Sequence, residues 1–174
     1  MTEGYPEGWD LVFWTVEATN AAADRLTGTS WHDPHRAFAA TCEVLWWIYN
    51  LDELLARTLG DSYAVERALH HIGDQLDGLL YARNRLTHKL DVLEPVEPGG
   101  NASDAGYNTP GYWVWRHLPR ERRRGVNPGE REYERFIAGH RVQSILTMVL
   151  TFLRSQAQVS LPASRQTQRS PGLA

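Results

Sequence analysis

The apolar stripe between Val65 and Leu93 is the sequence feature that most constrains the fold. Its members are separated alternately by four and three residues, the repeat that places side chains on one face of an α-helix. A helix with such a face must bury it against other helices, so the stripe predicts a helical bundle. One member is an arginine. The stripe consists of Val65, Leu69, Ile72, Leu76, Leu79, Arg83, Leu86, Leu90 and Leu93.

The preceding segment predicts a second helix with the same repeat. Asp33 and Pro34 are suited to an N-cap and a first helical residue. Gly60 is expected to end this helix in a left-handed conformation, and Asp61 or Ser62 to cap the next one. The two helices would then form a long antiparallel hairpin.

The rest of the chain predicts shorter elements around this hairpin. Prolines and glycines over 94–111 indicate an exposed loop, and the alternating residues from 112 to 116 indicate a strand or hairpin. Further helices are predicted over 9–26, from an N-cap at Asn127 to about 138 where Gly139 ends it, and over 141–157. We therefore predict one all-α domain over 9–160 of four to five helices with a small β insertion. Residues 1–8 are a polar lead, and 161–174 a disordered tail.

Composition bounds what this domain can do. A chain of 174 residues, 42% of them hydrophobic, suffices for one domain with a core. It has no apolar run near the roughly 20 residues that span a bilayer, and its first residues are acidic where a signal peptide is basic. We therefore expect a cytoplasmic protein without membrane association. The net charge of −3 means that binding to nucleic acid must be local, and Cys42, the single cysteine, can form no internal disulfide.

The segment YARNRLTHKL, residues 81–90, carries the candidate chemistry. Arg83 lies there within the apolar stripe, and two interpretations are open. Either its side chain extends to solvent or pairs with an acid as a structural residue, or it belongs to a functional site. A polar row accompanies it, made by residues that would lie one above another on a regular helix: Asp77, Tyr81, Asn84 and His88.

In this setting Arg83, Asn84 and His88 resemble the RNA-cleaving motif of the HEPN superfamily, in which an arginine and a polar residue precede a histidine on a long helix. The resemblance covers about residues 10–155. Its other markers are LWWIYNLDELL before the motif, WVW after a loop and AGHRV before the last helix, a layout similar to small HEPN-like proteins of actinobacteria. It implies an endoribonuclease that needs neither metal nor cofactor, acts as a toxin or defence effector, and has a cognate antitoxin as a further partner.

The resemblance also implies roles for the motif residues. His88 would transfer protons, Arg83 would bind the phosphate, and Asn84 would orient the imidazole or bind an oxygen. One monomer offers one acid–base group where the reaction uses two, so a homodimer is part of the hypothesis. Five residues on a straight helix separate Arg83 and His88 by about 140°, so the arginine must swing or the two copies must complement each other. Leu90 stands where toxins controlled by nucleotide transfer carry a tyrosine, so that control is not implied.

Other residues suggest plainer roles. His32 and His35 have a metal-like spacing without a third ligand, so we predict no metal site there. Trp46 and its neighbour Trp47 are interpreted as core and interface residues, because their helix lacks the basic neighbours of a base-stacking site. Asp52 and Glu53 are interpreted as members of structural ion pairs and not as general bases. RNA contacts are predicted on the basic residues near the motif and in the loop after the strand: Arg85, Lys89, Arg120, Arg122, Arg123 and Arg124.

Two further functions remain open beside the ribonuclease. One is a catalytically silent helical module that binds a nucleotide or a protein partner in a dimer cleft. The other is an interaction protein encoded by a phage or mobile element, with a coincidental motif and the WVW segment as its contact surface.

Overall fold

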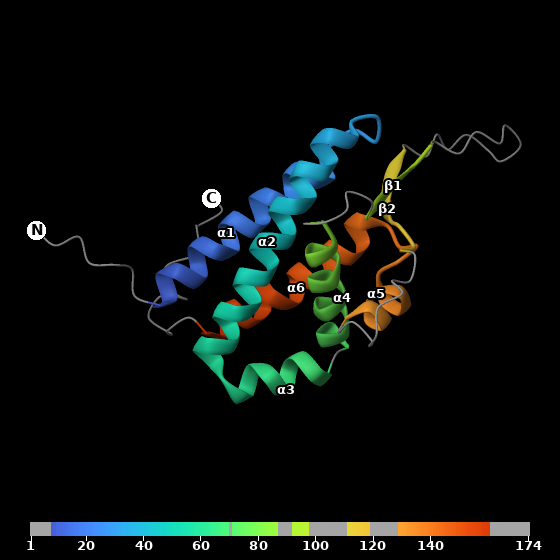
Figure 1. Cartoon of the computed structure of the whole chain (residues 1–174). Helices are drawn as coiled ribbons and strands as arrows, with labels where there is room; N and C mark the ends of the chain where they lie inside the picture. The colour runs from blue at the N-terminus through green and yellow to red at the C-terminus, as the bar shows by residue number, and fades with distance from the viewer. Residues whose placement is uncertain (1–7, 70, 87–91, 98–110, 119–128, 161–174) are drawn as a thin grey trace, which may run out of the picture.

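The computed structural model describes residues 8–69, 71–86, 92–97, 111–118 and 129–160. Within these ranges the chain forms six helices and one two-stranded antiparallel sheet, which confirms the prediction of an all-α bundle with a small β insertion (Figure 1). None of these helices is long and apolar enough to cross a membrane. The predicted lead and tail lie outside the described residues, except for Gly8, which begins the first helix.

The longest antiparallel pair is α1 (Gly8–Thr27) and α2 (Pro34–Leu59), which lie side by side (Figure 1). The carboxylate of Asp33 accepts the backbone N–H of Arg36 at 3.0 Å, and Pro34 is the first helical residue, as predicted. One face of α2 is buried in the core, including Val44, Ile48 and Leu55. The long hairpin of the fold is therefore α1 with α2, not α2 with the helix that follows.

The predicted helix over 65–93 is divided into α3 (Asp61–Leu69) and α4 (Ile72–Leu86). His71 has a φ of 53°, which a right-handed helix cannot contain. Gly73 permits the turn to be tight, because a Cβ there would lie 3.1 Å from the carbonyl oxygen of Arg67. The break leaves Val65 and Leu69 exposed at 57% and 64%, whereas the stripe residues of α4 other than Arg83 are buried.

The junction between α2 and α3 also differs from the prediction. Gly60 has the expected positive φ of 57°, but its ψ of −132° is not that of the left-handed helix. The hydroxyl of Ser62 donates to the carbonyl of Leu59 at 2.8 Å instead of accepting an N–H of the following helix. At this change of direction the Ser62 hydroxyl therefore satisfies a carbonyl at the end of α2 and does not cap α3.

The small sheet pairs β1 (Leu93–Val96) with β2 (Tyr112–Trp115), with Leu93 opposite Trp115. The predicted strand at 112–116 is confirmed, and its alternation is reflected in the burial of Trp113 and Trp115. The predictions that the helix continues to Leu93 and that a loop begins at 94 are wrong. Pro95 cannot continue a helix, and pairing with β2 supplies this segment with backbone hydrogen bonds. Residues 98–110 of the predicted loop lie outside the described residues.

Two helices complete the fold, α5 (Glu130–Phe136) and α6 (Val142–Ser160). The cap position of α5 is held by Gly129 with a φ of 84°, and Glu130 is the first helical residue instead of a capping-box acid; Asn127, the predicted cap, lies outside the described residues. A Cβ at position 129 would overlap the backbone carbonyl of Asp77, so only glycine lets α5 start directly against α4. The helix α6 packs against α1, α2, α4 and β2 (Figure 1).

Candidate functional site

Arg83 projects from α4 onto aromatic side chains of α2. Its guanidinium carbon lies 4.0 Å from the centroid of the Tyr49 ring and 6.0 Å from that of Trp46, which is a cation–π arrangement. Within the described residues no carboxylate lies within ion-pair distance of Arg83. The half-buried side chain is therefore held by aromatic rings and not by an acid.

The donors of Arg83 are only partly used. Nη2 donates to the side-chain oxygen of the exposed Asn84 at 3.1 Å. Nη1 is shielded from solvent and has no hydrogen-bond partner among the described residues. A buried donor without a partner costs about 1–3 kcal/mol, so this resting position of the guanidinium is not its most favourable one electrostatically.

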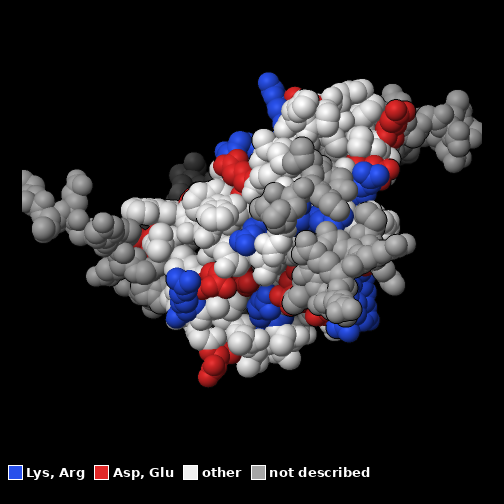
Figure 2. Space-filling model, viewed as in Figure 1, with Lys and Arg blue, Asp and Glu red and all other residues white. Residues whose placement is uncertain are grey.

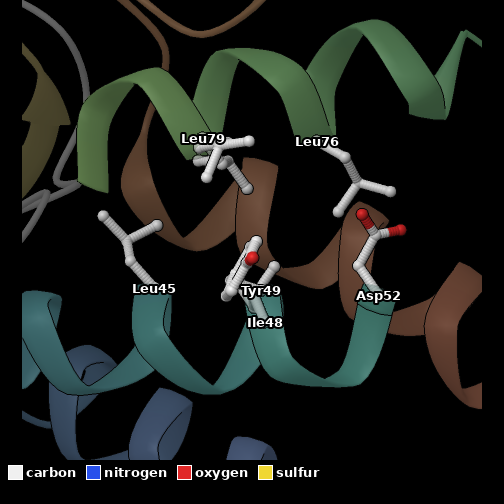
Figure 3. Close-up of a pocket in the computed structure, with 7 residues that line it drawn as sticks. Leu45, Ile48, Tyr49, Asp52, Leu76 and Leu79 are labelled. Carbon is white, nitrogen blue, oxygen red and sulfur yellow. The ribbon is translucent and has the colours of Figure 1, made fainter. Parts of the chain in front are cut away.

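Tyr49 is fixed from its other side by the interface of α2 and α4. It borders a small cavity that is also lined by Asp52, four leucines and an isoleucine. The cavity volume is about 10 Å³, which is enough for no more than one water molecule. Figure 3 shows the α2 side chains of this cavity pointing toward Leu76 and Leu79 of α4. The ring on which Arg83 rests is thus part of the packed contact between two helices, and this limits its movement.

The predicted polar row of α4 does not form one groove. Asp77 binds Arg67 of α3 at 2.7 Å. Tyr81 is only 3% exposed, and its ring lies 5.7 Å from that of Tyr133 on α5. Because α5 begins directly against this side of α4, it covers the middle of the row and leaves Asn84 at an exposed position.

Several predicted site residues lie outside the described residues. His88 follows Leu86, the last described residue of α4, by two positions in the sequence. The same applies to the other candidates that the structure does not describe: Lys89, Arg120, Arg122, Arg123 and Arg124. Arg85 is described, and it is only 5% exposed.

A second polar cluster connects α2, α3 and α4. Arg67 donates to Asp52 at 3.2 Å and to Asp77 at 2.7 Å, and the hydroxyl of Tyr63 donates to Asp52 at 2.5 Å. Burial, together with the charge of Asp52, raises the pKa of Tyr63 well above its ordinary value. The prediction that Asp52 forms a structural ion pair is confirmed.

The surface between α1 and α2 contains a hollow of about 280 Å³. Trp46, which is 55% exposed, lines it, and so do Trp47 and Tyr49. On the face drawn in Figure 2, basic and acidic side chains of the described residues occur in small mixed groups and not in one continuous basic patch. Any anion that binds this face would therefore depend on individual cations and not on a continuous basic surface.

The remaining candidate, HDPH, has a local structural role. Asp33 caps α2, and the ring of His32 lies 3.4 Å from that of Trp31. Among the described residues no group of three or more histidine, cysteine, aspartate or glutamate side chains could hold a metal ion.

Comparison of the chain with protein-family models, with curated proteins and with solved structures finds no match. The functional argument therefore depends on the residues themselves. Of these, sequence reasoning missed Tyr49, the ring beneath Arg83. Its spacing offered a signal, because Tyr49 lies four residues after Leu45 and three before Asp52, on the side of α2 that faces α4.

Proposed function

We propose that this chain is an endoribonuclease that cleaves RNA without a metal ion, with Arg83 binding the scissile phosphate and His88 transferring protons. The observation that supports it most is the position of Arg83. No carboxylate of the described residues neutralises its charge. Its side chain is half-buried, and its guanidinium carbon lies 4.0 Å from the centroid of the Tyr49 ring. A phosphate would supply the negative charge and the paired acceptors that a guanidinium binds best.

The proposal includes a movement of Arg83. Among the described residues its Nη1 has no partner, so rotation toward a bound phosphate would replace an unsatisfied donor with a charge-assisted hydrogen bond. Asn84 already holds Nη2 at 3.1 Å and would keep the guanidinium near the helix surface. Such a swing also answers the geometric difficulty that a spacing of five residues, on a regular helix, would place Arg83 and His88 on different sides.

In the proposed reaction the 2′-hydroxyl of RNA attacks the adjacent phosphorus. The bond from the 2′-oxygen to phosphorus forms while the bond to the 5′-oxygen breaks, which leaves a 2′,3′-cyclic phosphate and a 5′-hydroxyl. One imidazole takes the proton of the 2′-hydroxyl, and a second gives a proton to the 5′-oxygen. Arg83 stabilises the charge that develops on the phosphate oxygens. Two copies of His88 in a homodimer would supply the two imidazoles.

The decisive experiment incubates the full-length protein with mixed RNA in EDTA and compares it with His88→Ala. We expect cyclic phosphate ends with the unaltered protein and a loss of about 100-fold or more in His88→Ala, the range of general acid–base catalysis. The matched control is His35→Ala, which removes an exposed histidine at the start of α2 and should leave cleavage unchanged. Equal activity in the unaltered protein and His88→Ala would remove His88 from the mechanism.

The dimer is tested separately by sedimentation at micromolar concentration. We expect both the unaltered protein and His88→Ala to be dimers. This result would agree with a site formed by two copies, in which the imidazole is needed for the reaction and not for dimer formation. A single species of the monomer mass, 19.8 kDa, would contradict two facing copies.

A non-catalytic binding module remains the second candidate, because aromatic side chains line the hollow between α1 and α2, and its charged lining residues Glu53 and Arg57 are paired with each other. It predicts that the chain binds its ligand and leaves RNA intact in the same assay.

A further inference from the structure

Trp46 is placed on the surface in a way that packing alone does not explain. It is 55% exposed on α2, although burial of a tryptophan is a large source of stability. Trp14 of α1 is exposed to nearly the same extent, 56%, but it is not among the residues that line the hollow. The two tryptophans therefore allow a direct comparison between an exposed ring beside the hollow and one outside its lining.

The basic neighbour that Trp46 lacks on its own helix is supplied by α4. Sequence spacing placed no cation near it, but in the folded chain the guanidinium of Arg83 lies 6.0 Å from its ring and 4.0 Å from Tyr49. An aromatic face beside a cation is the combination with which proteins bind single-stranded nucleic acid. The expectation that Trp46 lacks a basic neighbour is therefore corrected by the tertiary structure.

The hollow beside these residues has the properties of a site for a flat, polar ring. Its volume is about 280 Å³, and both Trp46 and Tyr49 line it. Asn50, also in the lining, donates its amide nitrogen to the carbonyl of Trp46 at 2.8 Å. This bond holds the side chain in place and leaves its amide oxygen as an acceptor that a ligand amino group could reach.

The charges around the hollow favour an anion at one end only. Glu53 and Arg57 line it together, and their charges compensate each other at 3.5 Å. Arg83 contacts two of the lining rings and has no such compensation among the described carboxylates. An aromatic ligand that carries a negative charge next to its ring would match this asymmetry, whereas the apolar face of a partner helix would leave the cation unused.

We infer that the hollow between α1 and α2 is a subsite for an unpaired RNA base, which stacks on Trp46 while a phosphate of the same strand binds Arg83. The inference rests on the proposed function and adds a substrate class to it, namely single-stranded RNA. In a duplex each base is covered by its neighbours and its partner, so only an unpaired base can present its face to a side chain.

The test measures binding of a fluorescently labelled single-stranded oligonucleotide that carries 2′-O-methyl groups. These groups block the attacking hydroxyl, so binding is measured whether or not the protein cleaves RNA. We expect Trp46→Ala to weaken binding about 5- to 150-fold, the range for loss of one base–aromatic stack, and Trp46→Phe to weaken it less. Trp14→Ala is the matched control and should bind like the unaltered protein. The same oligonucleotide annealed to its complement should bind more weakly and without dependence on Trp46.

The outcomes separate this inference from the proposed function. Binding that depends on Trp46 without cleavage of ordinary RNA would support the subsite and contradict the nuclease. Cleavage by a Trp46→Ala protein with unchanged affinity would overturn the subsite and leave the nuclease intact. A change of oligomeric state in Trp46→Ala, with RNA affinity unaltered, would overturn the subsite in favour of an interface between copies.

Discussion

Two arginines that face α2 show how differently one residue type can be used in a small bundle. Arg67 of α3 binds two carboxylates, Asp52 at 3.2 Å and Asp77 at 2.7 Å. Arg83 of α4 rests on Tyr49 and binds the uncharged Asn84. The first charge is neutralised by two carboxylates, whereas no carboxylate of the described residues neutralises the second. The difference indicates which arginine serves the fold and which is available for a ligand.

The residues of α2 that contact the two arginines lie one helical turn apart. Tyr49 and Asp52 are three residues apart on α2 and line the same small cavity (Figure 3). A carboxylate in such a place satisfies a guanidinium and fixes it, whereas an aromatic face attracts the cation without using its N–H donors. A change of side chain within one turn therefore separates a structural contact from a candidate binding site.

Arg67→Met should give the largest loss of stability. Among the described residues, Asp52, whose side chain is 18% exposed, would keep only the hydroxyl of Tyr63 as a partner for its half-buried charge. Removing one member of a buried ion pair typically costs about 3–5 kcal/mol, and partial exposure of this cluster places the expected loss near the lower end. Urea unfolding followed by circular dichroism measures it.

The control for this change is Arg57→Met. Arg57 pairs with Glu53 at 3.5 Å, but its side chain is 78% exposed, so we expect a change of less than about 0.5 kcal/mol. If both variants lose the same small amount of unfolding free energy, the network around Asp52 contributes no more than a surface ion pair. Arg67 would then not be a structural arginine, and the contrast with Arg83 would be wrong.

Tyr63→Phe should have an intermediate effect that depends on pH. Loss of the hydroxyl that donates to Asp52 should cost about 1 kcal/mol near neutral pH. Burial and the charge of Asp52 raise the pKa of Tyr63 in the folded chain, so above about pH 10 the unfolded chain ionises this tyrosine while the folded chain does not. The hydroxyl's contribution is therefore complete below that pH and declines above it.

The measurement is the difference in unfolding free energy between the unaltered chain and Tyr63→Phe, followed from about pH 8 to 11. Other groups titrate in both proteins and cancel in this difference. We expect the difference to shrink, and then change sign, as the pH rises past the ordinary tyrosine pKa. A difference that stays constant across this range would show that Tyr63 titrates alike in the folded and unfolded chains.

Sequence periodicity could predict the elements whose signals lie within one helix, namely the spacing of apolar residues and the capping residues. The stripe of α4 and the cap at Asp33 are confirmed, because spacing and capping chemistry are local. The break at His71 was missed, because the apolar repeat continues through it without a proline or glycine at that position. The strand at Leu93 was missed because its hydrogen-bond partners lie about twenty residues further along the chain.

The candidate site shows the same division. Spacing identified Arg83 as an unusual member of the stripe, but it could not show that Tyr49 and Trp46 from another helix surround it. The predicted groove along the polar row is wrong for a related reason. The close approach of α5 at Gly129 buries Tyr81, and this contact could not be inferred from α4 alone. Contacts between helices decide both outcomes, and a single sequence does not contain their geometry.

Arg83→Met should change the stability much less than Arg67→Met does. The stack on Tyr49 contributes about 0.5–1 kcal/mol, but Nη1, which has no partner among the described residues, costs a similar amount or more. The unfolding free energy should therefore stay within about 1 kcal/mol of the unaltered value. Urea unfolding beside Arg67→Met makes the comparison direct, because the substitution is the same. RNA cleavage and binding should fall in Arg83→Met despite its intact fold. A loss as large as that of Arg67→Met would instead place Arg83 among the structural arginines, because a guanidinium that the fold requires is not free to leave its ring for a phosphate.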